Sequence, residues 1–166
     1  CFSMTTREDS FAWSVPYFNN SITVLTAAGA GIYSLDGLVG KRVYVQTSSS
    51  QAAQMITTFK TLTSTFSNLY MVDDVNLEIL LLRKGEADAC ILDVAAAKYY
   101  VSEYPDELYI LDKKLSDDQC AVAFRKDDEA TAAQVSKTLC AMASDGSLLA
   151  LGQKWGLADS LCISAL

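Results

Sequence analysis

Three separated segments of this 166-residue chain carry side chains able to hold a carboxylate and an ammonium group. Arg7 has a guanidinium, which binds a carboxylate through two parallel N–H donors. Ser48, Ser49 and Ser50 form a hydroxyl-rich turn that opens a helix pattern, where backbone N–H groups favour anions. Asp93 ends an apolar strand pattern and can accept hydrogen bonds from an ammonium group. A carboxylate and an ammonium are the groups that a free amino acid presents.

Arg7 has a second possible role as an ordinary surface arginine. The neighbouring Glu8 and Asp9 could pair with it in solvent, and such a pair would require no ligand. In the ligand-binding alternative, Ser3 and Thr5 would add hydroxyl or backbone donors to the same carboxylate.

The serine turn and Asp93 also have capping alternatives. Serine and aspartate are both preferred helix N-caps, so the turn could cap the helix that follows it, and Asp93 could cap a helix beginning at Val94. Capping and ligand binding are compatible at the serine turn.

The overall composition excludes several functional classes. The net charge is −7 and there is no cluster of Lys and Arg, which argues against nucleic-acid binding. Histidine is absent, which removes the commonest general base and the commonest metal ligand. No apolar run approaches the roughly 20 residues needed to span a bilayer. We therefore expect no cofactor, no metal and no catalytic residue.

The five cysteines show no C-x-x-C spacing, so neither a zinc site nor a redox motif is predicted. Cys90 and Cys120 lie in apolar strand patterns, and Cys140 lies on a helical face. We expect these three to be small buried hydrophobic residues.

An alternation of strand and helix patterns must position the candidate residues. It predicts an α/β fold whose mainly parallel sheet is covered on both faces. Asn76 is expected to cap the helix that ends before Gly85. The expected strands lie at 22–27, 42–46, 69–72, 87–92, 108–111 and 120–124, and the other main helices at 50–62, 94–104, 130–143 and 148–155.

Four groups of motifs, in the same order along the chain, resemble the small bacterial solute-binding proteins of amino-acid ABC transporters (family 3). These proteins have the type II periplasmic-binding fold. The matching stretches are Phe2-Ser3-Met4-Thr5-Thr6-Arg7 with Trp13-Ser14-Val15-Pro16-Tyr17; 38–50, which contains Lys41-Arg42-Val43-Tyr44-Val45-Gln46; 85–93, which contains Gly85-Glu86-Ala87-Asp88-Ala89; and Ala123-Phe124-Arg125-Lys126 with 145–155.

The resemblance implies a two-lobed fold with lobe 2 complete over 28–115. Residues 1–27 and 116–166 would form only a partial lobe 1, because the family usually has a strand, a helix and a strand before these motifs. Two crossing strands, at 22–27 and 120–124, would allow hinge closure. An exposed strand edge in lobe 1 could drive dimerisation or swapping.

The resemblance also implies a function and a set of binding residues. Arg7 would bind the carboxylate of a small amino acid and Asp93 its α-ammonium. Gln46 would contact the ligand's side chain or bridge the two lobes, with Gln favouring a neutral ligand. The protein would be extracytoplasmic, periplasmic or lipid-anchored, and would deliver the amino acid to an ABC transporter permease without catalysis. The alternatives are the ligand-sensing domain of a membrane receptor and a dehydratase on the same fold.

Overall fold

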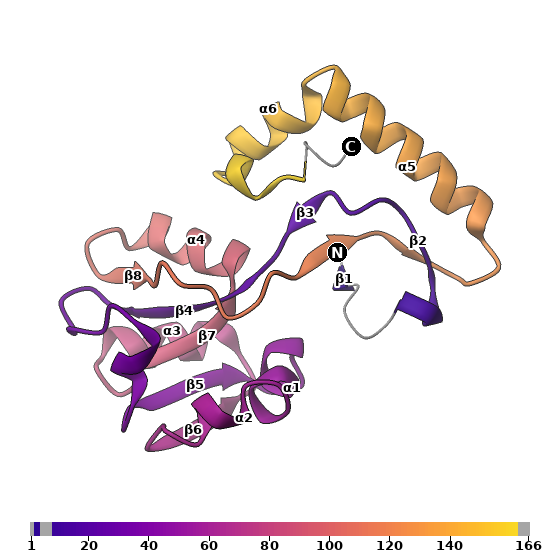
Figure 1. Cartoon of the computed structure of the whole chain (residues 1–166). Helices are drawn as coiled ribbons and strands as arrows, with labels where there is room; N and C mark the ends of the chain where they lie inside the picture. The colour runs from indigo at the N-terminus through magenta and orange to yellow at the C-terminus, as the bar shows by residue number, and fades with distance from the viewer. Residues whose placement is uncertain (1, 4–7, 163–166) are drawn as a thin grey trace. The chain divides into compact units, whose positions relative to one another are not determined.

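A computed structural model describes residues 2–3 and 8–162 of the chain (Figure 1). The chain divides into two compact units: unit 1 comprises Cys1–Ser21 and Asp117–Leu166, and unit 2 comprises Ile22–Ser116.

Unit 2 is built on a five-stranded sheet with the order β6-β5-β7-β4-β8. β5 is parallel to both β6 and β7, whereas β4 runs antiparallel to β7 and β8. The sheet is therefore mixed, with β4 as the reversed strand. Its strands are β4 (Ile22–Ala27), β5 (Arg42–Gln46), β6 (Asn68–Val72), β7 (Ala89–Asp93) and β8 (Leu108–Ile110).

Alternating side chains of this sheet supply two apolar cores, one on each face. Val43 and Val45 of β5 and Ile91 of β7 pack on one face with Ala52 and Met55. The opposite face contains the second core, whose buried members are Leu25, Ile79, Leu82, Ala87, Cys90, Leu92, Ala97 and Leu108. The helices of unit 2 are α1 (Ser50–Ile56), α2 (Lys60–Thr63), α3 (Val75–Arg83) and α4 (Val94–Glu103), with the 3₁₀ turn η2 at Leu35–Leu38.

The position of β4 corrects the expected lobe boundary. The sequence led us to place 22–27 in lobe 1, as a crossing strand. In the structure this segment pairs with β7 and β8, and Val24 and Leu25 are fully buried in the two cores of unit 2. The first boundary between the units therefore falls at Ser21 and Ile22 rather than after residue 27.

Unit 1 contains short strands and two longer helices. Its sheets have the orders β1-β9-β3 and β10-β2, and Ser14 Oγ accepts a hydrogen bond from Val122 N–H at 3.0 Å. Only Ala132 of helix α5 is buried. The elements are β1 (Phe2–Ser3), η1 (Glu8–Ser10), β2 (Ala12–Trp13), β3 (Phe18–Asn19), β9 (Gln119–Ala121), β10 (Ala123–Phe124), α5 (Glu129–Ser144), α6 (Ser147–Lys154) and η3 (Ala158–Ser160).

Three local expectations differ from the structure. The expected helix at 50–62 is two helices, α1 and α2, and the expected strand at 120–124 is divided into β9 and β10. Asn76 does not cap α3; the cap is Asp74, whose carboxylate accepts from Asn76 N–H at 2.9 Å. Asp74 lies two residues earlier and offers the stronger acceptor.

Cys90 and Cys120 are buried as expected, whereas Cys140 is only partly buried and Cys120 is not a free thiol. Cys90 is buried and free, and Cys140 is half-buried and free. Cys120 is buried but disulfide-bonded, which corrects its assignment as a simple small hydrophobic residue. Cys spacing along the sequence could not reveal this bond, because disulfide pairing depends on proximity in the fold.

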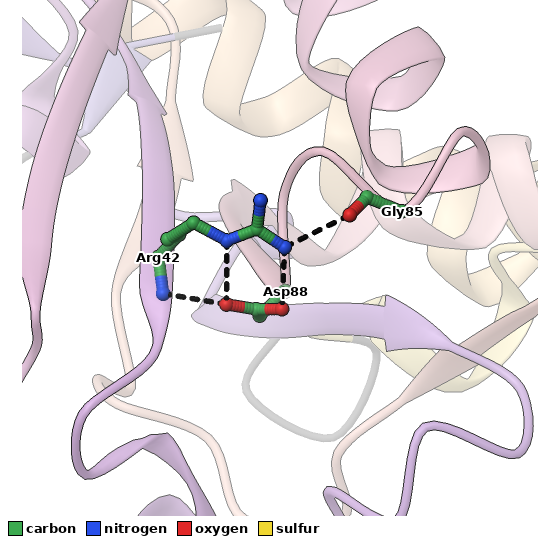
Figure 2. Close-up of polar contacts among 3 residues, drawn as sticks. All are labelled: Arg42, Gly85 and Asp88. Atoms are coloured by element: carbon green, nitrogen blue, oxygen red, sulfur yellow. Dashed lines mark hydrogen bonds and ion pairs between the residues drawn. The ribbon is translucent and has the colours of Figure 1, made fainter.

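Arg42 at the start of β5 is tied to Asp88, just before β7, by a bidentate ion pair (Figure 2). Arg42 Nε donates to Asp88 Oδ2 at 3.0 Å, and a terminal guanidinium nitrogen donates to Oδ1 at 2.9 Å. The same nitrogen donates to the carbonyl of Gly85 at 2.8 Å, and the Arg42 backbone N–H donates to Oδ2 at 2.8 Å. The side-chain and backbone hydrogen bonds from Arg42 to its carboxylate hold the pKa of Asp88 below its ordinary value of 3.8.

We predict that Asp88→Asn lowers the stability of the protein at pH 7. A depressed folded-state pKa contributes stability that is complete above the unfolded value near 3.8 and is lost as the pH falls through the folded value. The difference between wild type and variant should therefore narrow as the pH falls below 4. Urea unfolding followed by circular dichroism measures it, with the exposed Asp106→Asn as control. An equal difference at pH 7 and pH 3 would contradict the prediction.

Candidate functional site

A pocket of about 130 Å³ lies at the carboxyl ends of β5 and β7 in unit 2. Parallel neighbours end at the same edge of a sheet, so Gln46 and Asp93, the last residues of these two strands, come together there. The pocket is lined by Gln46, Ser49, Gln51, Val75, Ile91, Leu92, Asp93 and Ala96. Three of the sequence-predicted residues, Gln46, Ser49 and Asp93, are therefore in one place.

Asp93 has the capping role that the sequence left open for it, and it also lies at the pocket, where its contact with a ligand stays a prediction. Its Oδ1 accepts from Ala96 N–H at 2.8 Å and caps α4, while its side chain also lines the pocket. Within the described part of the chain, Oδ2 has no hydrogen bond. Capping fixes the carboxylate in place, and the second oxygen remains able to accept from a ligand.

Ser49 is the member of the serine turn that lies in the pocket. Its side chain accepts from Ala52 N–H at 3.0 Å and caps α1, so the capping alternative holds. Ser50 is the first residue of α1 and its hydroxyl donates to Gln51 Oε1 at 3.3 Å. Ser48 has a φ of 60°, in the left-handed region that favours glycine. Whether Ser48 and Ser50 contact a ligand stays a prediction.

Gln46 is exposed at the end of β5 and lies beside the loop that follows β6. Its Nε2 donates to the carbonyl of Asp73 at 3.4 Å, which leaves the amide oxygen available to a ligand. This geometry is compatible with the expected contact to a ligand side chain, but does not identify that side chain.

Sequence reasoning missed Gln51, Val75 and Ala96. Each lies in the first turn of a helix that begins at the same edge of the sheet: α1, α3 or α4. The signal was present, because helices that follow parallel strands all begin at the carboxyl edge. A choice of candidates by polarity alone overlooked Val75 and Ala96, which are apolar residues of the pocket lining.

Arg7 and Thr5 lie outside the described residues. Ser3 is described only in its backbone, where it pairs with Cys120 in the β1–β9 ladder. The roles expected for these three residues therefore stay predictions.

Asp93 is the one charged side chain among the described residues that line the pocket. The pocket wall is otherwise apolar or neutral, and a carboxylate in such surroundings favours a positively charged partner. In the described ranges, no three His, Cys, Asp or Glu side chains gather as a metal site would require. No helix found there is long and apolar enough to cross a bilayer.

The family model for bacterial extracellular solute-binding proteins, family 3, matches residues 2–158. The chain belongs to this family, which confirms the resemblance drawn from the motifs. The fold is confirmed by a Streptococcus pneumoniae ABC uptake transporter substrate-binding protein with bound histidine. That structure superposes with a TM-score of 0.85 at 22% identity, over 97% of this chain and 68% of the other.

Two curated relatives are amino-acid-binding proteins by name. The L-cystine-binding protein TcyJ of Escherichia coli K12 is 28% identical over 155 residues, which cover 92% of this chain and 56% of TcyJ. The arginine-binding extracellular protein ArtP of Bacillus subtilis 168 is 29% identical over 154 residues, covering 90% of this chain and 58% of ArtP. The chain thus spans little more than half the length of these relatives.

We predict that Ser49→Ala lowers the stability of helix α1, which begins at the pocket, whereas Ser50→Ala leaves this stability unchanged. Loss of an N-cap hydroxyl costs about 1 kcal/mol, because a helix N–H loses its partner. The Ser50 side chain bonds only to a neighbouring exposed amide. Urea unfolding and hydrogen exchange of α1 amides should separate the two variants. Equal stabilities would show that the Ser49 bond contributes nothing.

Proposed function

We propose that this chain is the ligand-holding part of an amino-acid-binding protein, and that it binds its ligand without converting it. The observation that carries the proposal is the placement of Asp93. Its carboxylate caps α4 through one oxygen and lines a small pocket at the carboxyl edge of parallel strands, and the other oxygen has no hydrogen bond to the described residues. Family membership and the two amino-acid-binding relatives support the same function.

The negative charge of Asp93 in the pocket is complementary to the α-ammonium group of an amino acid. An α-ammonium group would donate to the free oxygen of Asp93, and a charge-assisted bond of this kind contributes about 1.5–3 kcal/mol. The ligand carboxylate requires a cation, which the described pocket lining does not include. Arg7 is our candidate for that cation.

The neutral amides of Gln46 and Gln51 make a neutral ligand side chain the preferred class. An amide offers both a donor and an acceptor but no charge to balance a cationic or anionic side chain. The names of the relatives include cystine and arginine, so a ligand panel must cover both neutral and charged amino acids.

In the whole protein, we propose that two lobes close around the ligand by a hinge and present it to an ABC transporter permease. Unit 2 would be lobe 2. Unit 1 would be part of lobe 1, and the weak burial of α5 supports the presence of further packing partners there, within the protein or in a dimer. The disulfide at Cys120 supports an extracytoplasmic, oxidising location, periplasmic or at the cell surface.

We predict that Asp93→Asn weakens amino-acid binding about ten- to a hundred-fold, the equivalent of a lost charge-assisted bond. Asn is also a good N-cap, so α4 should keep its stability. Isothermal calorimetry against L-cystine, L-arginine, L-glutamine and L-glutamate gives the affinities. The exposed Asp112→Asn is the charge-matched control. An unchanged affinity in Asp93→Asn would refute the assigned role of Asp93.

We predict that Arg7→Ala, made in the full-length protein, abolishes binding of the same amino acids. The α-carboxylate would lose its bidentate partner, while the exposed Arg125→Ala removes the same charge elsewhere and should bind normally. Retained micromolar affinity in Arg7→Ala would eliminate Arg7 as the carboxylate-binding residue.

A further inference from the structure

Glu78 of α3 is a buried carboxyl group without a hydrogen-bond partner among the residues that the structure describes. It is 0% exposed, and neither of its carboxyl oxygens has a hydrogen bond to those residues. An ionised carboxylate in such a site would lose its hydration with no compensation, so the neutral acid is favoured. Burial, with a smaller contribution from the charge of Asp74, raises the pKa of Glu78 from 4.5 to about 8.

No cation is described among the groups that face Glu78 from the elements around it. On α3 itself the facing group is Asp74, and on β7 it is the Cys90 thiol, which donates to the Glu78 carbonyl at 3.5 Å. On α4 it is Tyr100, whose hydroxyl donates to Asn76 Oδ1 at 2.9 Å. Tyr44 of β5 packs against the same apolar core.

Glu78 lies one helical turn after Val75, a residue of the pocket wall. Val75 lines the pocket and precedes Glu78 by three residues, so the two are neighbours on the surface of α3. Side chains of a helix lean toward its N-terminus, which directs the carboxyl of Glu78 beneath the turn that presents Val75. Leu92 also belongs both to the pocket lining and to the core against which α3 packs.

We propose that Glu78 couples the opening of this pocket wall to the release of a proton. The wall meant here is the first turn of α3, which contains Val75. In its closed state this turn packs on the sheet and Glu78 stays protonated. In its open state the turn moves away from the sheet, so the carboxyl group becomes hydrated and ionises. A rise in pH therefore favours the open wall, and acidic conditions hold it closed. The significance of the wall for a ligand rests on the proposed binding function; the proton coupling does not.

The direction of the pH effect follows from linkage. The pKa of Glu78 is higher in the closed state than in an open, solvated one, so its contribution to the closed state is complete below pH 4.5. That contribution is lost as the pH rises from 4.5 to about 8, and it stays constant above that pH.

The thiol of Cys90 provides a direct readout of this opening, because it is buried against Glu78. Its alkylation by iodoacetamide, measured by peptide mass spectrometry, should be compared in wild type and Glu78→Gln between pH 5.5 and 9.5. Taking the ratio of the two rates removes the titration of the thiol itself. We expect the ratio to rise about tenfold per pH unit up to about pH 8 and then to level off.

Several controls keep this test decisive. Glu103→Gln removes an exposed charge from the neighbouring helix α4 and should match wild type. Glu78→Met, which also cannot ionise, should match Glu78→Gln and replaces it if that variant folds poorly. Hydrogen exchange of α3 amides should show the same difference, whereas amides of β5 should not.

Two results would overturn the proposal: a rate ratio that stays constant within twofold across the pH range, or an equal change in α3 and β5, which would indicate unfolding of the whole unit. The experiment contains no amino acid. Its failure is therefore distinct from a failure of the proposed binding function.

Discussion

The pairing of β5 with its parallel neighbour β7 is the constraint on which the described site depends. The ladder aligns Val43 with Ala89 and Val45 with Ile91, so the two strands end within one residue of each other, and Gln46 and Asp93 line the same pocket. At the opposite edge, the Arg42–Asp88 ion pair joins the beginnings of the same strands. A slip of one residue would turn every side chain to the other face of the sheet. The ion pair opposes such a slip at a distance from the pocket.

At the carboxyl edge of the sheet, three helices begin, and each is N-capped by a polar side chain. Ser49 caps α1, Asp74 caps α3 and Asp93 caps α4. Each cap satisfies a backbone N–H that would otherwise need water, so the same polar side chains stabilise the helices and remain near the pocket. The left-handed φ of Ser48 adds strain at the start of this edge, where a non-glycine residue is disfavoured.

Much of unit 2 could be predicted because its signals are local. The strand at 42–46 was expected from the sequence, and the apolar strand pattern that ends at Asp93 indicated where this residue would lie. That β4 belongs to the sheet of unit 2 could not be predicted in the same way, because the residues it pairs with, such as Ile91 and Ile110, are far along the chain. Pairing of distant segments is set by the whole fold and not by the composition of one strand.

The burial of Glu78 could not be predicted from the sequence pattern. An acidic residue in the first turn of an amphipathic helix is normally read as solvent-exposed and favourable to the helix dipole. Here α3 packs on the sheet with the Glu78 side chain fully buried, and within the described part of the chain neither carboxyl oxygen has a hydrogen-bond partner. The helix that supplies Val75 to the pocket wall thus also buries a carboxyl group, and this burial is unfavourable to folding. A protein that needed only a rigid wall would be more stable with an apolar residue at this position, because an unpaired buried acid opposes folding at neutral pH.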